Sequence, residues 1–246
     1  ATYRIATRVN WIESWKNSPD ARVSGLWIRG GHPTDAHDHQ DRGHLNLILD
    51  GKPVLIEAGL VSYGIPEHPP HFRSVAGHNV LQVGDHAPAA LTTKTLKAGA
   101  GQILDHAHRA APLATTRLEA TGGDVTVDAT RCYATVNRWQ RRVTWDRTGA
   151  DITDDVELET PDIILFRWHL GESPEAPREI AGNRIQVGHI AIRSEATAPL
   201  NITIEPMPDG TLHFGKMNHH ACLVVRTTAP ARALTLRTRV QLNDTP

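Results

Sequence analysis

Short runs of alternating apolar and polar residues fill most of this 246-residue chain. A period of two residues is the pattern of β-strands with one buried face. The expected strands lie in the segments 21–31, 44–59, 78–85, 116–120, 122–136, 138–159, 162–170, 184–194, 200–206, 221–228 and 233–242. Turn residues separate them at short intervals, and no strand–helix–strand alternation appears. The pattern therefore predicts an all-β fold, a large antiparallel two-sheet β-sandwich.

A few segments depart from this strand pattern. Residues 5–17, with Trp11 and Trp15 four positions apart, predict a short helix. Residues 64–76 hold three prolines and no periodicity, so we expect a loop there. Asp50-Gly51 between two apolar runs predicts a β-hairpin. The simplest division is an N-terminal segment, 1–22, followed by one sandwich domain, 23–246.

Composition excludes several classes of protein. Lys and Arg number 26 against 27 Asp and Glu, and this balance argues against nonspecific nucleic-acid binding. No apolar run reaches the roughly 20 residues that span a bilayer. Two cysteines, Cys132 and Cys222, are too few for a disulfide framework, and they either pair or stay free.

Histidine is the unusual residue: there are 15, and eight lie between His32 and His86. On a strand, His37, His39 and Asp41 share one face. The hairpin returns an apolar strand that ends at Glu57, and the next strand begins at His78. Two imidazoles and a carboxylate from three strands form a plausible open zinc-type site, with His39, Glu57 and His78 as ligands.

The ordered set of motifs resembles the heparinase II/III-like family of polysaccharide lyases. The set begins with His37-x-His39-x-Asp41-x-Gly43 and an apolar strand, and a second strand ends in Glu57-Ala58-Gly59. It continues with Tyr63, Arg73-Ser74 and Gly77-His78-Asn79-Val80. The family carries Asp where this chain has Glu57, and a small residue where this chain has His44.

This resemblance implies a fold and an activity. Family members join an N-terminal α/α toroid to a C-terminal β-sandwich and cleave acidic, uronate-containing polysaccharide by β-elimination. By motif position, His37 is the active-site histidine, and His39, Glu57 and His78 hold a divalent metal, expected to be Zn²⁺. Tyr63, His71 and Arg73 line the substrate cleft.

The chain has no room for the helical toroid, which in such lyases supplies a tyrosine base. The resemblance therefore implies a C-terminal domain that lacks its helical partner and is inactive alone, and it favours a periplasmic or secreted location. Two other interpretations remain open at this point. One is a cupin-like metal-binding barrel, although His44 stands where cupins carry Glu. The other is a noncatalytic carbohydrate-binding sandwich.

Other polar residues have a plain interpretation. Arg138, Arg141 and Arg142 are expected on a solvated strand face. His169 is expected to be a hydrogen-bonded core residue, and His220 to lie in an exposed loop.

Overall fold

The structure is a computed structural model. It describes residues 3–4, 24–31, 38–59, 61, 64, 66–85, 101–104, 110–119, 121–172, 175–207 and 220–243. The helix expected over residues 5–17 lies outside these ranges, as does most of the segment 1–22. Within the described part, no helix is long and apolar enough to cross a membrane.

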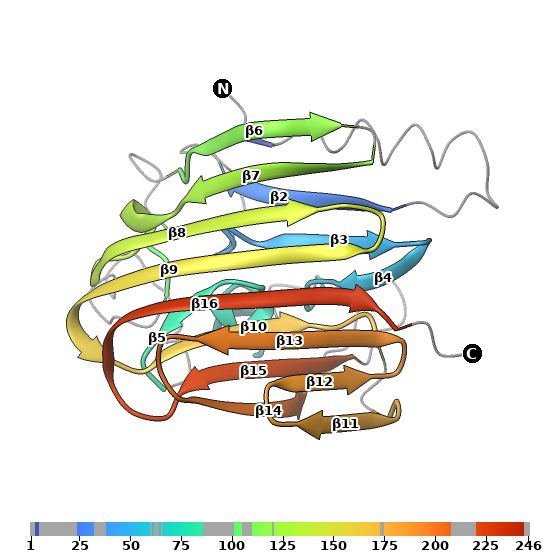
Figure 1. Ribbon diagram of the computed structural model, residues 1–246. Coiled ribbons are helices and arrows are strands. Elements are labelled where there is room, and N and C mark those ends of the chain that lie inside the picture. The colour runs from blue at the N-terminus through green and yellow to red at the C-terminus, as the bar shows by residue number, and fades with distance from the viewer. Residues whose placement is uncertain are drawn as a thin grey trace.

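One layer of the fold is an antiparallel eight-stranded sheet, which crosses Figure 1 from β6 to β11. Its strands, in spatial order, are β11 (Arg178–Ala181), β12 (Arg184–Val187), β13 (Ile190–Ala196), β16 (Ala231–Leu242), β9 (Gly149–Asp162), β8 (Val136–Trp145), β7 (Gly122–Asp128) and β6 (Leu113–Glu119).

The other layer consists of two four-stranded sheets. The first contains β1 (Tyr3–Arg4), β2 (Gly25–Gly31), β3 (Leu45–Leu49) and β4 (Lys52–Leu55). The second is ordered β14 (Leu200–Pro206), β15 (Ala221–Thr227), β10 (Ile164–His169) and β5 (Leu81–Val83). An isolated bridge, Leu55 to Leu170, connects the end of β4 with the residue that follows β10 and so joins the two sheets.

The hydrophobic core lies between the two layers. Side chains from the second layer, such as Leu26, Leu47 and Phe166, meet Trp139 and Val156 of the eight-stranded sheet. The fold is therefore the expected antiparallel β-sandwich, except that one of its two layers is divided into two sheets. The described residues do not form the small barrel that a cupin requires. Both cysteines are buried, and no disulfide joins them.

The hairpin at Asp50-Gly51 forms as the sequence predicts. Asp50 has φ +49° and Gly51 has φ +76°, and Leu49 pairs with Lys52. Positive φ at both turn residues is the requirement of the two-residue turn whose twist suits a hairpin. The turn places the strand that leads to Glu57 directly beside β3.

The expectation of a loop over residues 64–76 is wrong in part. This stretch contains a π-helical turn, His68–Phe72, and a 3-10 turn, Val75–Gly77. The prolines favour a helical turn here because Pro is tolerated where the first N–H groups have no helical partner. The second turn begins with Ser74, whose hydroxyl accepts a hydrogen bond from the Ala76 N–H.

These turns lie across the outer face of the second layer, the face that points away from the eight-stranded sheet. Gly77 accepts a hydrogen bond from the Ala58 N–H at 3.0 Å, and Arg73 accepts one from the Gln40 N–H at 2.9 Å. The turns therefore gather the histidines of residues 68–78 over the strands that carry the other candidate residues.

Candidate metal centre and histidine cluster

A network of charged side chains fixes the segment that carries His39. Arg29 on β2 donates to Asp41 at 2.7 Å, and Arg42 forms a close ion pair with buried Asp38. Arg42 also donates to the His39 carbonyl at 2.9 Å. Because both ends of this short segment are tied down, the backbone at His39 has little freedom.

Gly43, the glycine of the HxHxDxG motif, has a steric reason to be glycine. Its φ is +84°, and a Cβ added there would lie 2.8 Å from the Cη2 atom of Trp139. Both the left-handed backbone and the close approach to a buried indole exclude larger residues. The tight turn allows the chain to enter β3 with His44 beside the site.

Asn79 joins two strands and the segment after β4 behind His78. Its side-chain amide donates to the carbonyls of Leu45 and Ile56, at 2.8 and 2.7 Å. Its Oδ1 accepts from the His169 N–H at 2.7 Å. These bonds hold β3, the segment after β4 and β10 together, and they fix the position of the preceding residue, His78.

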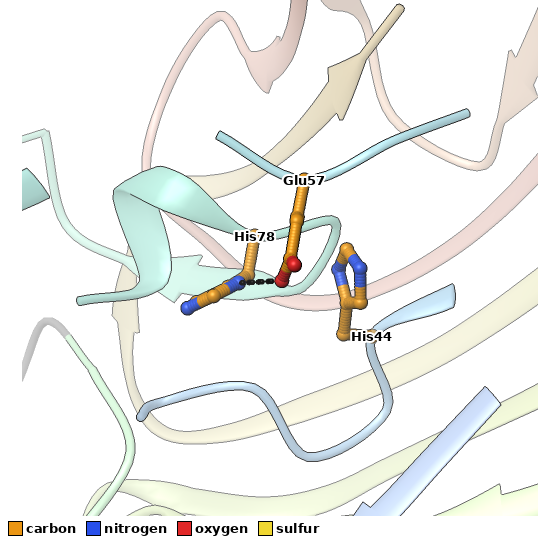
Figure 2. A group of neighbouring side chains, drawn as sticks. All are labelled: His44, Glu57 and His78. Carbon is orange, nitrogen blue, oxygen red and sulfur yellow. Dashed lines mark ion pairs between the residues drawn. The ribbon is translucent and has the colours of Figure 1, made fainter. Parts of the chain in front are cut away.

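Figure 2 shows the carboxylate of Glu57 between the rings of His44 and His78. One ligand-type atom from each of the three residues lies within 4.8 Å of the others. The His78 Nδ1 atom is 3.8 Å from a Glu57 oxygen. His44 and His78 are buried, whereas the Glu57 side chain is 46% exposed, so the group opens toward solvent on the carboxylate side.

His78 is the residue whose surroundings point to a metal. Both of its ring nitrogens are buried and have no hydrogen-bond partner within the described residues. A buried polar atom without a partner destabilises a protein by about 1–3 kcal/mol. A cation bound between His78 and Glu57 would satisfy one of these nitrogens.

His44 is held in a different way, because both of its nitrogens are in use. Its Nδ1 accepts from the Asn79 N–H at 2.9 Å, so its Nε2 carries the proton and donates to Asn46 at 3.0 Å. His44 therefore supports the site and has no free nitrogen for a cation.

His39 is the other histidine that fits a metal. Its ring centroid lies 5.4 Å from that of His78. Zn–N bonds of 2.0–2.1 Å at a tetrahedral angle separate two ligating rings by about 5 Å. This spacing is compatible with His39 and His78 as two ligands of one ion. The three residues whose ligand-type atoms lie within 4.8 Å of one another, however, include His44 in place of His39.

Burial keeps these imidazoles neutral. It lowers the pKa of His39 to about 4, helped by the charges of His68 and Arg73. Burial also lowers the pKa of His44 to about 3 and that of His78 well below its ordinary value. The pKa of Glu57 is raised by burial, against the attraction of Arg29. Neutral imidazole is the form that binds metal ions.

A second group of histidines lies beside this centre. His169 is fully buried, with Nε2 facing the Ala76 carbonyl at 3.0 Å and Nδ1 facing His220 Nε2 at 2.8 Å. The carbonyl can only accept, so His169 donates from Nε2 and accepts from His220. The expectation of a hydrogen-bonded core residue is confirmed for His169, whereas the exposed loop position expected for His220 is wrong, because its side chain is 2% exposed.

The predicted substrate-binding residues have different outcomes. His71 is buried, its Nε2 has no hydrogen-bond partner within the described residues, and its ring lies 6.4 Å from that of His169. Arg73 donates to the Asp38 carbonyl at 2.9 Å, next to His39. His37 and Tyr63 lie outside the described residues, so their roles stay predictions.

Arg141 shows most clearly what the sequence analysis missed. It was expected on a solvated face, but its side chain is fully buried and makes a two-pronged ion pair with Asp154, at 2.8 and 3.1 Å. Its remaining nitrogen donates to the Gly43 and Asn79 carbonyls. The available signal was its alternation with Trp139 and Val143, which places Arg141 on the buried face of β8.

Comparison with known proteins identifies the family. The family model described as "Heparinase II/III-like, C-terminal" matches residues 22–233. No curated protein matches the chain. A crystal structure of heparinase III covers 92% of the chain with a TM-score of 0.70 and 13% identity. The heparan sulfate lyase of Pedobacter heparinus covers 91% with a TM-score of 0.68 and 14% identity.

The chain spans about 34% of the length of each of these two structures. At such low identity the structural likeness shows the fold alone, and the match of the family model over most of the chain shows the family. This chain belongs to the heparinase II/III-like family, and its sandwich is the family's C-terminal domain.

Proposed function

We propose that this chain forms the β-sandwich wall of a polysaccharide lyase cleft, in which a uronate-containing acidic polysaccharide is cleaved by β-elimination. The observation that carries the proposal is the convergence of neutral imidazoles, a carboxylate and Arg73 on one outer face of the sandwich. The family match and the two lyase structures with the same fold support it.

The reaction sets three chemical requirements. The uronate carboxylate must be neutralised so that the C5 proton becomes acidic, a base must take that proton, and an acid must protonate the departing O4 atom. Arginine and histidine stabilise the developing charge by donating to it, and tyrosine or histidine can transfer the protons. We assign charge neutralisation and proton transfer to His37 and Arg73, and sugar contact to Tyr63 and His71.

A metal ion is the second part of the proposal. His39, Glu57 and His78 would hold Zn²⁺, which when bound supplies a fixed positive charge that orders its ligands. These residues come from the segment before β3, the segment after β4 and the turn before β5. The three segments would then be joined beside the cleft, so we regard the role of the metal as chiefly structural.

The activity needs groups that this sandwich does not contain. In the resembling lyases the main base is a tyrosine of the helical domain. We therefore expect the 246-residue chain alone to bind acidic oligosaccharides with very weak or no cleavage. Robust formation of unsaturated products from alginate or heparan oligosaccharides, followed by ultraviolet absorbance, would contradict this division of roles.

Elemental analysis of the purified chain tests the metal. We expect about one zinc per chain, lost in His39→Ala and His78→Ala. His189→Ala is the matched control, because His189 pairs with Glu172 on another part of the sandwich. A well-folded wild-type chain that binds no zinc when supplied with it would remove the metal from the proposal.

A further inference from the structure

A hollow of about 260 Å³ opens on the outer face of the eight-stranded sheet, over the neighbouring strands β12, β13 and β16 of Figure 1. This face points away from the layer that carries the candidate metal centre. The residues that line the hollow are Arg184, Ala191, Ile192, Arg193, Arg239 and Gln241. Its lining therefore contains three arginines and no acidic residue, and we call it the arginine pocket.

The strand register places the three arginines in one row. Arg184 pairs with Arg193, and Arg193 pairs with Arg239. Neighbours along the strands, such as Ile185 and Ile192, are buried in the core, so alternation turns the arginines to the outer face. Since adjacent strands are about 4.8 Å apart, the row spans about 10 Å. Like charges directly opposite each other destabilise a sheet, and an anion between them would remove that repulsion.

The floor of the arginine pocket is a small residue. Ala191 lies between Gln186 and Gln241 on the neighbouring strands, and it is 5% exposed. Its short side chain leaves a space that the longer side chains around it enclose. The Gln241 Oε1 atom accepts from the Arg239 Nε atom at 3.2 Å, which leaves the Gln241 NH₂ group as a further donor. The pocket thus combines a hollow with donors from separate strands.

Carboxylates neutralise only part of the charge of this row. Arg193 pairs with Glu195 at 2.7 Å, and Arg239 pairs with Asp151 at 2.6 Å. A guanidinium group has several N–H donors, so one carboxylate leaves some of them available. Within the described part of the chain, Arg184 forms no ion pair. The excess positive charge of the pocket is therefore that of Arg184.

Two more charged residues flank the arginine pocket on the same face, and their charges offset each other. Glu179 of β11 pairs across strands with Gln186, and Arg237 of β16 pairs with Glu195. Among the described residues, Glu179 forms no ion pair with Arg184. The surroundings therefore leave the charge of Arg184 without a partner.

We propose that the arginine pocket binds a sulfate group of a sulfated glycan, on the face of the sandwich opposite the candidate metal centre. The inference rests on the proposed function for the class of polymer. A sulfate ester has several terminal oxygens that accept from donors on different sides, whereas a planar carboxylate is matched by one guanidinium. A row of three arginines around one hollow therefore suits sulfate better.

The expected benefit is a second attachment point for a long polymer. When one chain is held at two places, the second contact forms at a high effective concentration, so the polymer binds more tightly than through either site alone. The arginine pocket would thus retain a long sulfated glycan on the sandwich while another part of it occupies the proposed cleft.

The test follows backbone amide signals in NMR spectra of the 246-residue chain while a sulfated heparan hexasaccharide is added. We expect the signals of Arg184, Ala191 and Gln241 to shift. An unsulfated hexasaccharide with the same backbone should shift them much less. Higher salt should weaken the binding, because exposed charges are screened by ions.

Three variants separate the arginine pocket from a general effect of charge. Arg184→Gln removes the unpaired guanidinium and should weaken binding at these signals about fivefold, the factor for one charge contact in water. Gln241→Glu keeps the shape but places a carboxylate in the lining, so it should weaken binding at least as much. Arg117→Gln is the matched control, because it removes the same charge from β6, at the opposite edge of the sheet, and it should have no effect. Thermal unfolding of each variant verifies that the fold is intact.

The outcomes distinguish this inference from the proposed function. Equal weakening by Arg184→Gln and Arg117→Gln would mean that only net charge matters, and it would overturn the arginine pocket. If the hexasaccharide shifts signals around His39 and His78 but none at the arginine pocket, this inference is wrong and the proposed function survives. Shifts at the arginine pocket alone would support this inference and count against the proposed cleft. If no signal moves, both proposals fail.

Discussion

Removal of the Arg141 side chain, as in Arg141→Met, should destabilise the sandwich more than any surface substitution. The change leaves Asp154 buried without its cation. Breaking a buried ion pair by removing one partner destabilises by about 3–5 kcal/mol. The whole stability of a domain is about 5–15 kcal/mol, so the variant should be marginal.

The contacts of Arg141 set the expected size of the effect. Its guanidinium makes two bonds to Asp154, one to Gly43 and one to Asn79. It also lies over the Trp168 ring, 5.0 Å from its centroid. Each unsatisfied carbonyl adds about 1 kcal/mol or more. We therefore expect a loss near the upper end, about 5 kcal/mol.

Urea unfolding of four proteins measures this effect: wild type, Arg141→Met, Asp154→Leu and the double variant. An m-value of about 3 kcal/mol/M converts the expected loss into a midpoint lower by about 1–2 M. The double variant should be more stable than the sum of the single losses implies, because it leaves no unpaired buried charge.

A loss below about 1 kcal/mol in Arg141→Met, or strict additivity in the double variant, would refute this account of the core. Arg138→Met is the matched control, because Arg138 lies on the same strand with its side chain 52% exposed. Its effect should stay within about 0.5 kcal/mol.

Three other perturbations have definite expected outcomes. Gly43→Ala should lower the free energy of unfolding by about 1–3 kcal/mol. Gly182→Ala should lower it less, because Gly182 has φ +62° but no atom lies within 4 Å of the added Cβ. Thermal unfolding of the two variants measures this difference. In the folded protein the pKa of His39 and of His71 is lowered to about 4. The stability that depends on keeping these rings neutral should therefore be fully present above about pH 6.5, decrease as the pH drops toward about 4, and stay constant below about pH 4. His71→Gln should reduce the slope of the melting temperature against pH. If zinc binds as proposed, free zinc at 100 times its Kd stabilises by about 2.7 kcal/mol. A chelator should then lower the melting temperature by about 5–10 °C, and an unchanged temperature would contradict the metal site.

Local patterns in the sequence determined the strands and the hairpin. Alternation along a strand and positive φ at Asp50-Gly51 depend on a few neighbouring residues, so they can be interpreted without the fold. The ordered motifs also indicated Glu57 and His78, which the structure places side by side. Part of the requirement for glycine at position 43 is also local, because the backbone there has a positive φ.

Tertiary structure alone decided which histidines face one another. His44, His169 and His220 join the outer-face cluster through pairing between distant strands, and no sequence spacing encodes that pairing. The turns over residues 68–77 depend on hydrogen bonds with Gln40, Ala58 and the β10 residue His169, which lie in other parts of the chain. Arginine usually lies on a protein surface. The position of Arg141 on β8 nevertheless points its side chain toward the core, where a buried carboxylate and two carbonyls stabilise its charge.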